Sequence, residues 1–160
     1  MVIALLPVLF LIGLSGCGSS TSTASSSGKS AVIEGWKSAF RAFDSAVRDA
    51  DWRSKALVRT QTAPQYRRVE RNLQNESIDH ERAIGEDRVI NVEVTKIAGS
   101  IASVGACVQG DEVIVNSSGK PVSGVLGQSG PERIVAQMAR DADGWKLASQ
   151  TVTEGKCSAD

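Results

Sequence analysis

The sequence is poor in the residue types that several binding chemistries require. Aromatic side chains make up 4% of its 160 residues, so a stacking platform for bases or sugars is not expected. The formal net charge is zero, which argues against nucleic acid as a partner and against a purely electrostatic grip on anionic lipid. The single histidine, His80, lies between two acidic residues that point in different directions in any regular structure, so no histidine-centred site is predicted.

Long apolar runs are also missing. One uncharged apolar run, residues 2–14, falls below the roughly 20 residues that a membrane-spanning helix needs. It ends in small residues and is followed by Cys17, which is typical of the apolar part of an export signal. An ordinary cleaved signal followed by a chance cysteine would give the same pattern.

Residues 14–17, Leu-Ser-Gly-Cys, resemble the lipobox of bacterial lipoproteins. The resemblance implies that Cys17 receives a diacylglycerol, that the signal peptide 1–16 is removed, and that the cysteine becomes the new N-terminus. The acyl chains would hold the protein on the extracytoplasmic face of the cell membrane. The lipidated Cys and the Ser/Thr-rich residues after it, 17–30, are predicted to form a flexible tether, and residues 31–160 a single domain.

The three cysteines are expected to have two different roles. If Cys17 is acylated, Cys107 and Cys157 remain as an even pair in an oxidising compartment, which predicts a disulfide. Two reduced thiols are the alternative. With both thiols oxidised and one histidine in the chain, no zinc site of the usual nitrogen and sulfur type can form.

The first half of the domain has helical periodicity. Apolar residues recur every three or four positions on one predicted helix face, at Val32, Trp36, Phe40, Phe43 and Val47. Asp51 is predicted to cap a short helix that runs to Val58. Pro64 suits the first turn of another helix, with Tyr66, Val69 and Leu73 on its apolar edge and an end near Asn75.

The second half alternates with a period of two, as strands do. Strands are expected around residues 90–95, 101–109, 113–115 and 134–138, with a last strand from Trp145. The inward positions are predicted to be Ile90, Val92, Val94, Ile134, Ala136, Met138 and Leu147. Turns are expected at 99–100 and 143–144, and a tight reversal at 110–111 should lead into 113–115. Helices followed by strands indicate an α+β fold in which helices pack on an antiparallel sheet.

Four short motifs recur together along the domain. They are Gly-Ala-Cys-Val at 105–108, Gly-Lys-Pro-Val at 119–122, Asp-Gly-Trp-Lys-Leu at 143–147 and Gly-Lys-Cys at 155–157. The set resembles a group of bacterial secreted proteins and lipoproteins, of uncharacterised activity, that have an NTF2-like (cystatin-like) domain. The resemblance implies a cone of N-terminal helices on a curved antiparallel sheet, and it supports pairing of the mid-strand and terminal cysteines.

No catalytic set emerges from the sequence. There is no phosphate-binding glycine loop, no nucleophile elbow and no paired-glutamate pattern, and the predicted inner face is apolar. We therefore expect no cofactor, no metal site and no enzymatic activity. Tyr66 and His80 keep open one alternative, an isomerase or dehydratase that works in the pocket of the cone.

Charge is segregated between two neighbouring stretches. Residues 53–71 are strongly basic and residues 76–87 strongly acidic. One interpretation is that the two stretches neutralise each other; the alternative is that Arg67, Arg68 and Arg71 form an interaction face for an acidic partner or lipid headgroups. The expected function is a membrane-anchored binding module for a protein partner or a small apolar ligand, and the other alternative is an assembly module of an envelope or secretion complex.

Overall fold

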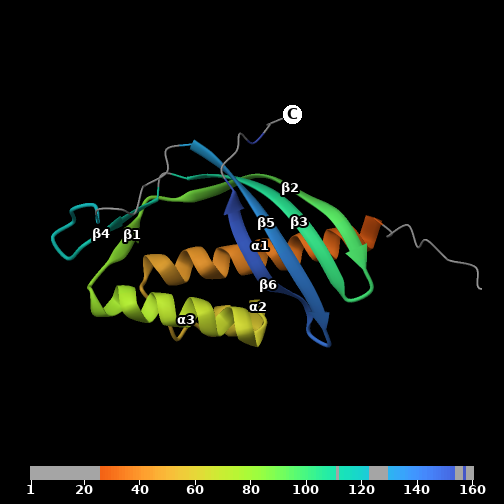
Figure 1. The fold of residues 1–160 in the computed structure, drawn as a ribbon, viewed down its shortest axis with the longest axis horizontal. Coiled ribbons are helices and arrows are strands. Elements are labelled where there is room, and N and C mark those ends of the chain that lie inside the picture. Colours follow the sequence, from red (N-terminus) through yellow and green to blue (C-terminus); the bar gives the residue numbers. More distant parts are fainter. Residues whose placement is uncertain (1–25, 111, 123–129, 154–156, 158–160) are drawn as a thin grey trace, which may run out of the picture.

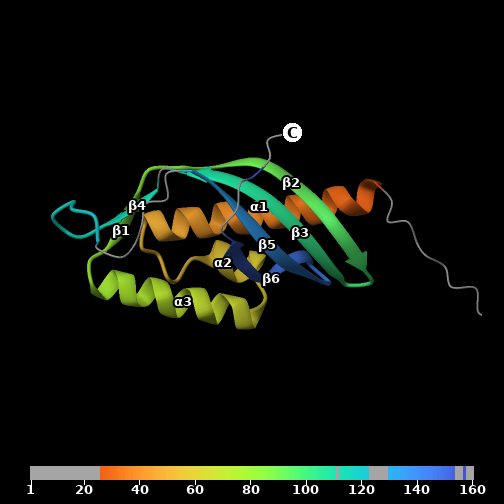
Figure 2. The same cartoon turned by 45° about the horizontal axis from the view of Figure 1, so that its top comes forward.

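In the computed structural model, residues 26–110, 112–122, 130–153 and 157 are described. Three helices come first, α1 (Ser26–Arg48), α2 (Lys55–Thr60) and α3 (Ala63–Ile78). Six strands follow: β1 (Arg82–Ile84), β2 (Asp87–Ala98), β3 (Ile101–Gly110), β4 (Val113–Val115), β5 (Gly130–Asp141) and β6 (Gly144–Thr153). Figures 1 and 2 show α1 between the curved sheet and α3. The predicted α+β class is therefore confirmed.

Helix α1 carries the apolar face that its periodicity predicts. Val32, Trp36 and Phe40 are buried against the sheet, and Val47 is buried further along, beneath α2 and α3. Phe43 is partly buried in this second cluster. The helix begins at Ser26, so its first turn extends into the segment predicted as tether. Within that turn the Ser30 hydroxyl donates to the Ser26 carbonyl oxygen at 3.1 Å, so this serine side chain finds its hydrogen-bond partner inside the helix.

The short helix after α1 begins later than predicted. Asp51 is not its cap, because the Asp51 carboxylate accepts from the Arg53 backbone N–H at 3.1 Å and closes a turn. Ser54 is the residue before α2. Helix α3 has Pro64 in its first turn, as predicted, and ends at Ile78.

The main sheet is antiparallel with the strand order β2-β3-β5-β6. Both predicted hairpin turns are present. Gly99, with φ of 60°, lies between the paired residues Ala98 and Ile101, and Gly144, with φ of 122°, pairs with Asp141. Positive φ at these turns favours glycine.

The concave face of the sheet packs on α1. Side chains from four strands join the α1 cluster, among them Val92, Val94, Ile134, Ala136, Met138 and Leu147, as predicted. Ile90 is the exception and is 38% exposed. A register shift between Val89 and Asn91 inserts a bulge, so Val89 contacts the core in place of Ile90.

The segment 113–115 does not continue the main sheet. Strand β4 pairs with β1, a strand that the sequence analysis missed, and the two form a separate ribbon. Ala83 of β1 is buried beside α3, in the cluster that contains Leu57 and Leu73. The predicted reversal at 110–111 therefore does not make a hairpin with β3; residue 111 lies outside the described residues.

A disulfide joins Cys107 in β3 to Cys157, with 5.6 Å between the two Cα atoms. The neighbours of Cys107 along the strand, Ala106 and Val108, belong to the inner cluster, so Cys107 faces the outer side of the sheet. The Cys157 sulfur lies 2.9 Å from the Glu132 carbonyl oxygen in β5. This pairing, predicted from the sequence, is confirmed. None of the described helices is both long and apolar enough to span a membrane.

Candidate functional site

An open groove of about 580 Å³ lies between α1 and the beginning of β2. One wall is formed by Ile33, Lys37, Phe40 and Arg41, whose spacing places them on one side of α1. The other wall is formed by residues 87–92. This volume falls within the range of ligand-binding pockets in proteins.

The groove combines an apolar floor with a basic rim. Ile33, Phe40 and Val89 supply apolar surface, and Lys37, Arg41 and Arg88 supply three positive charges. The Lys37 amine forms a salt bridge with the Glu34 carboxylate, which lies 3.6 Å away and is itself exposed. Arg41 and Arg88 form no salt bridge with any residue of the described segments, so their charges remain available to a bound group.

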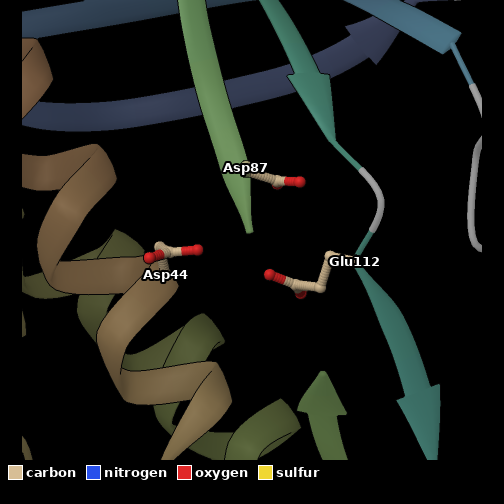
Figure 3. Close-up of side chains that lie close together, drawn as sticks. All are labelled: Asp44, Asp87 and Glu112. Carbon is tan, nitrogen blue, oxygen red and sulfur yellow. The ribbon is translucent and has the colours of Figure 1, made fainter. Parts of the chain in front are cut away.

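Three carboxylates meet where β2 begins. Figure 3 shows Asp44 from α1, Asp87 from β2 and Glu112 from the segment before β4 around one point. One oxygen from each lies within 4.8 Å of the other two, and all three residues are half-buried. Asp87 also lines the groove, so this acidic cluster lies at one end of it. Gly110 makes the approach possible, because a Cβ there would collide with the Asp87 carboxylate.

The carboxyl groups of the acidic cluster have different electrostatic surroundings. Burial, followed by the charges of Asp87 and Asp44, raises the pKa of Glu112 from 4.5 to about 7, while Arg48 acts in the opposite direction. Arg48 Nη2 lies 2.8 Å from Asp44 Oδ2. Near neutral pH, Glu112 is therefore about half protonated.

The acidic cluster could serve two chemistries. Three carboxylate oxygens suit a hard cation such as Ca²⁺ or Mg²⁺. They also suit a proton shared between Glu112 and Asp44, and the Arg48 charge beside Asp44 favours this second arrangement because it opposes another cation.

None of the described residues singled out in the sequence as a site lines the groove. Cys17 lies outside the described residues. Arg67, Arg68 and Arg71 are exposed on α3, do not line the groove, and form no salt bridge with a described residue. The Cys107–Cys157 bridge lies on the outer side of the sheet.

Tyr66 and His80, on which the enzyme alternative depends, also lie apart from the groove. The Tyr66 hydroxyl donates to Glu70 Oε1 at 3.0 Å, and burial together with this carboxylate raises the pKa of Tyr66. His80 is exposed after the end of α3, with φ of 56°. Neither side chain lines the groove.

The buried interior of the described segments is apolar apart from a few amides, one indole and the Oδ1 atom of Asp44. Its two core clusters contain no carboxylate and no imidazole. Gln61 and Gln65 are buried near α2 and α3, and buried side-chain atoms of both, with the Trp36 indole nitrogen, have no hydrogen-bond partner within the described part of the chain. An amide does not act as a general acid or base near neutral pH.

Sequence reasoning missed both features of this region. The positions of Lys37 and Arg41 on the polar side of the first helix were readable, but their proximity to Arg88 was not. The i, i+4 spacing of Asp44 and Arg48 could have suggested their ion pair. Nothing in the local pattern links this pair to Glu112, because the link depends on where β4 pairs.

The comparisons with known proteins identify a fold. No protein-family model matches the chain, and no curated protein matches it significantly. Among solved structures, a candidate aromatic ring hydroxylase from Novosphingobium aromaticivorans has 18% identity and a TM-score of 0.55, covering 76% of this chain and 87% of that one.

Two further structures are similar. The intermembrane space region of the chloroplast protein ARC6 has 9% identity and a TM-score of 0.53, covering 78% of this chain and 92% of that one. A candidate dehydratase of the NTF2-like family from Streptomyces avermitilis has 20% identity and a TM-score of 0.45, covering 75% and 93%. The first two structures share the α+β fold described above, and the NTF2-like assignment remains what the sequence resemblance implies. Identities this low establish the fold alone.

Proposed function

We propose that this chain is a non-enzymatic binding module, held by lipid at Cys17 on the extracytoplasmic face of the cell membrane. The observation that carries the proposal is the groove between α1 and β2, which is open, apolar at its floor and basic at its rim. The core clusters, by contrast, offer no acid or base for catalysis. An open groove lined by apolar and basic residues suits recognition of a partner.

The anchor rests on the resemblance of residues 14–17 to a lipobox. Helix α1 begins at Ser26, so even a fully extended link from Cys17 would span at most roughly 30 Å. On this proposal, the domain works close to the lipid surface and meets partners that are themselves in or near the membrane.

Membrane fractionation tests the anchor. The Cys17→Ala chain should leave the membrane fraction, whereas Cys107→Ser, which removes a cysteine of the disulfide, should stay in it. A Cys17→Ala chain that remains tightly associated with membranes would contradict the anchor.

Site-specific photocrosslinking in intact cells tests the binding surface. A photoreactive residue at Ile33, in the groove, should capture one partner reproducibly, and the same residue at Gln74, exposed on α3 and not part of the groove lining, should not. Equal background capture from both positions would count against the groove.

The exposed arginines of α3 favour a second candidate function, an assembly module of an envelope complex. Arg67, Arg68 and Arg71 point to solvent on the helix that covers the far side of α1 from the sheet (Figure 2). Reversal of their charge should then shift the size of complexes extracted from membranes, and unchanged complexes would remove this candidate.

A further inference from the structure

The groove follows the free edge of a β-sheet. Strand β2 is the first strand in the order β2-β3-β5-β6, and β3 is its only strand partner in the described part of the chain. Six consecutive β2 residues, 87–92, line the groove. Successive side chains of a strand point to opposite faces, so a surface that includes all six must run along the strand's edge.

An extended chain fits such an edge. Six strand residues span about 20 Å, and alternate residues present their N–H and C=O groups outward to a new partner. Helix α1 forms the opposite wall, which leaves a slot bounded by a helix and an edge strand. Addition of a peptide strand to an exposed sheet edge is a recurrent mode of recognition, in which backbone bonds give affinity and neighbouring side chains give specificity.

The charges around the slot select the partner. Lys37 and Arg41 lie on the helix wall and Arg88 lies on the strand wall. The carboxylate of Asp87, the one acidic group in the lining, packs against Gly110 near Glu112 and Asp44. Away from this acidic end, the rim is therefore complementary to acidic side chains.

We propose, building on the function proposed above, that an acidic, extended peptide segment of a partner protein binds in this groove and pairs with β2 as a fifth strand of the sheet. Ile90, which the bulge turns outward, and Val89 supply apolar contacts for its alternate side chains. A second copy of the chain is a poorer occupant, because edge-to-edge pairing would bring two basic rims together.

Fluorescence anisotropy with synthetic peptides tests the proposal. The probe is a fluorescein-labelled octapeptide of alternating aspartate and valine, and the protein is the full chain carrying Cys17→Ala. We expect saturable binding that weakens about tenfold in the double variant Arg41→Glu, Arg88→Glu, since two exposed charge contacts become repulsions. The matched control, Arg67→Glu with Arg71→Glu on α3, has the same net charge change and should bind like the parent.

Two further peptides keep the test independent of how the variants fold. A peptide of alternating lysine and valine should not bind, and an aspartate–valine peptide with alternate backbone nitrogens methylated should lose binding, because it cannot form the strand hydrogen bonds.

Equal binding of the acidic and basic peptides, or full binding of the methylated one, would overturn the proposal. So would binding of a fluorescent fatty acid in the groove without any binding of the acidic peptide, or a β2-dependent dimer in sedimentation. If the Cys17→Ala chain leaves the membrane but the peptide does not bind, this inference fails while the anchored module stands. If the peptide binds but the chain stays on membranes, the anchor fails instead.

Discussion

Glu112 offers the sharpest test of the electrostatics described here. Its pKa is raised from 4.5 to about 7 by burial and by Asp87 and Asp44. The folded protein therefore keeps a proton that the unfolded chain releases near pH 4.5. Folding stability should fall as pH rises from about 4.5 to 7, and the full penalty should be present above pH 7. Replacing Glu112 with glutamine removes the charge and the penalty together.

The size of the effect follows from the pKa. The difference between 4.5 and about 7 corresponds to about 3.4 kcal/mol at 1.36 kcal/mol per pKa unit. Glu112 is only half-buried, and solvent screens its neighbours, so we expect Glu112→Gln to stabilise the protein at pH 8 by about 1–2 kcal/mol. Near pH 4.5 the variant and parent should be equally stable.

Urea denaturation of both proteins at pH 4.5 and pH 8 measures this difference. The other carboxyls with raised pKa, Glu76 and Glu132, are present in both proteins and cancel in the comparison. Glu34→Gln, an exposed carboxylate on α1 outside the acidic cluster, is the control and should change stability little at either pH. Loss of stability in Glu112→Gln at pH 8, or a difference that is the same at both pH values, would refute the reasoning.

Three further predictions concern packing and the disulfide. Cys157→Ser should cost about 4 kcal/mol by the chain-entropy estimate for a bridge with a sequence separation of 50, and lower the melting temperature by roughly 10 °C in calorimetry. Gly35→Ala should destabilise by about 1 kcal/mol in urea titration. The new Cβ would lie 2.8 Å from the Trp145 carbonyl oxygen, and this overpacking exceeds the gain in helix propensity. Met138→Ala, at a fully buried side chain, should cost about 2–5 kcal/mol in the same titration.

The first two of these have a direct control or contrary result. Ser38→Ala in α1 adds no such collision and should be neutral or slightly stabilising. A Cys157→Ser protein that melts like the parent would mean that the bridge does not constrain the unfolded chain. A stabilised Gly35→Ala protein would mean that β6 retreats from α1 at little cost.

Local chemistry made much of the fold predictable. The α1 stripe was readable because one periodic face packs on the sheet, and the turns at Gly99 and Gly144 were readable because their residue pairs suit tight hairpins. Ile90 was misplaced because a bulge is a property of two paired strands rather than of one strand's pattern. Strand β1 was missed because three residues carry too little periodicity.

The candidate sites were less predictable, for a physical reason. The groove and the acidic cluster are assembled from residues that are distant in sequence, such as Asp44 and Glu112, and only the packing of α1 against β2 and β4 brings them together. The disulfide could be predicted from the sequence because cysteine chemistry restricts the choice of partner to one.

The bridge between Cys107 and Cys157 also governs how the domain would bear mechanical load. A pull along the chain from the N-terminal side to the C-terminal end would pass from β3 directly through the sulfur atoms. Strands β5 and β6 lie inside the closed covalent loop and would carry no tension. Force would extend only the chain before Cys107, and the loop between the two cysteines would not be stretched until the sulfur–sulfur bond was reduced.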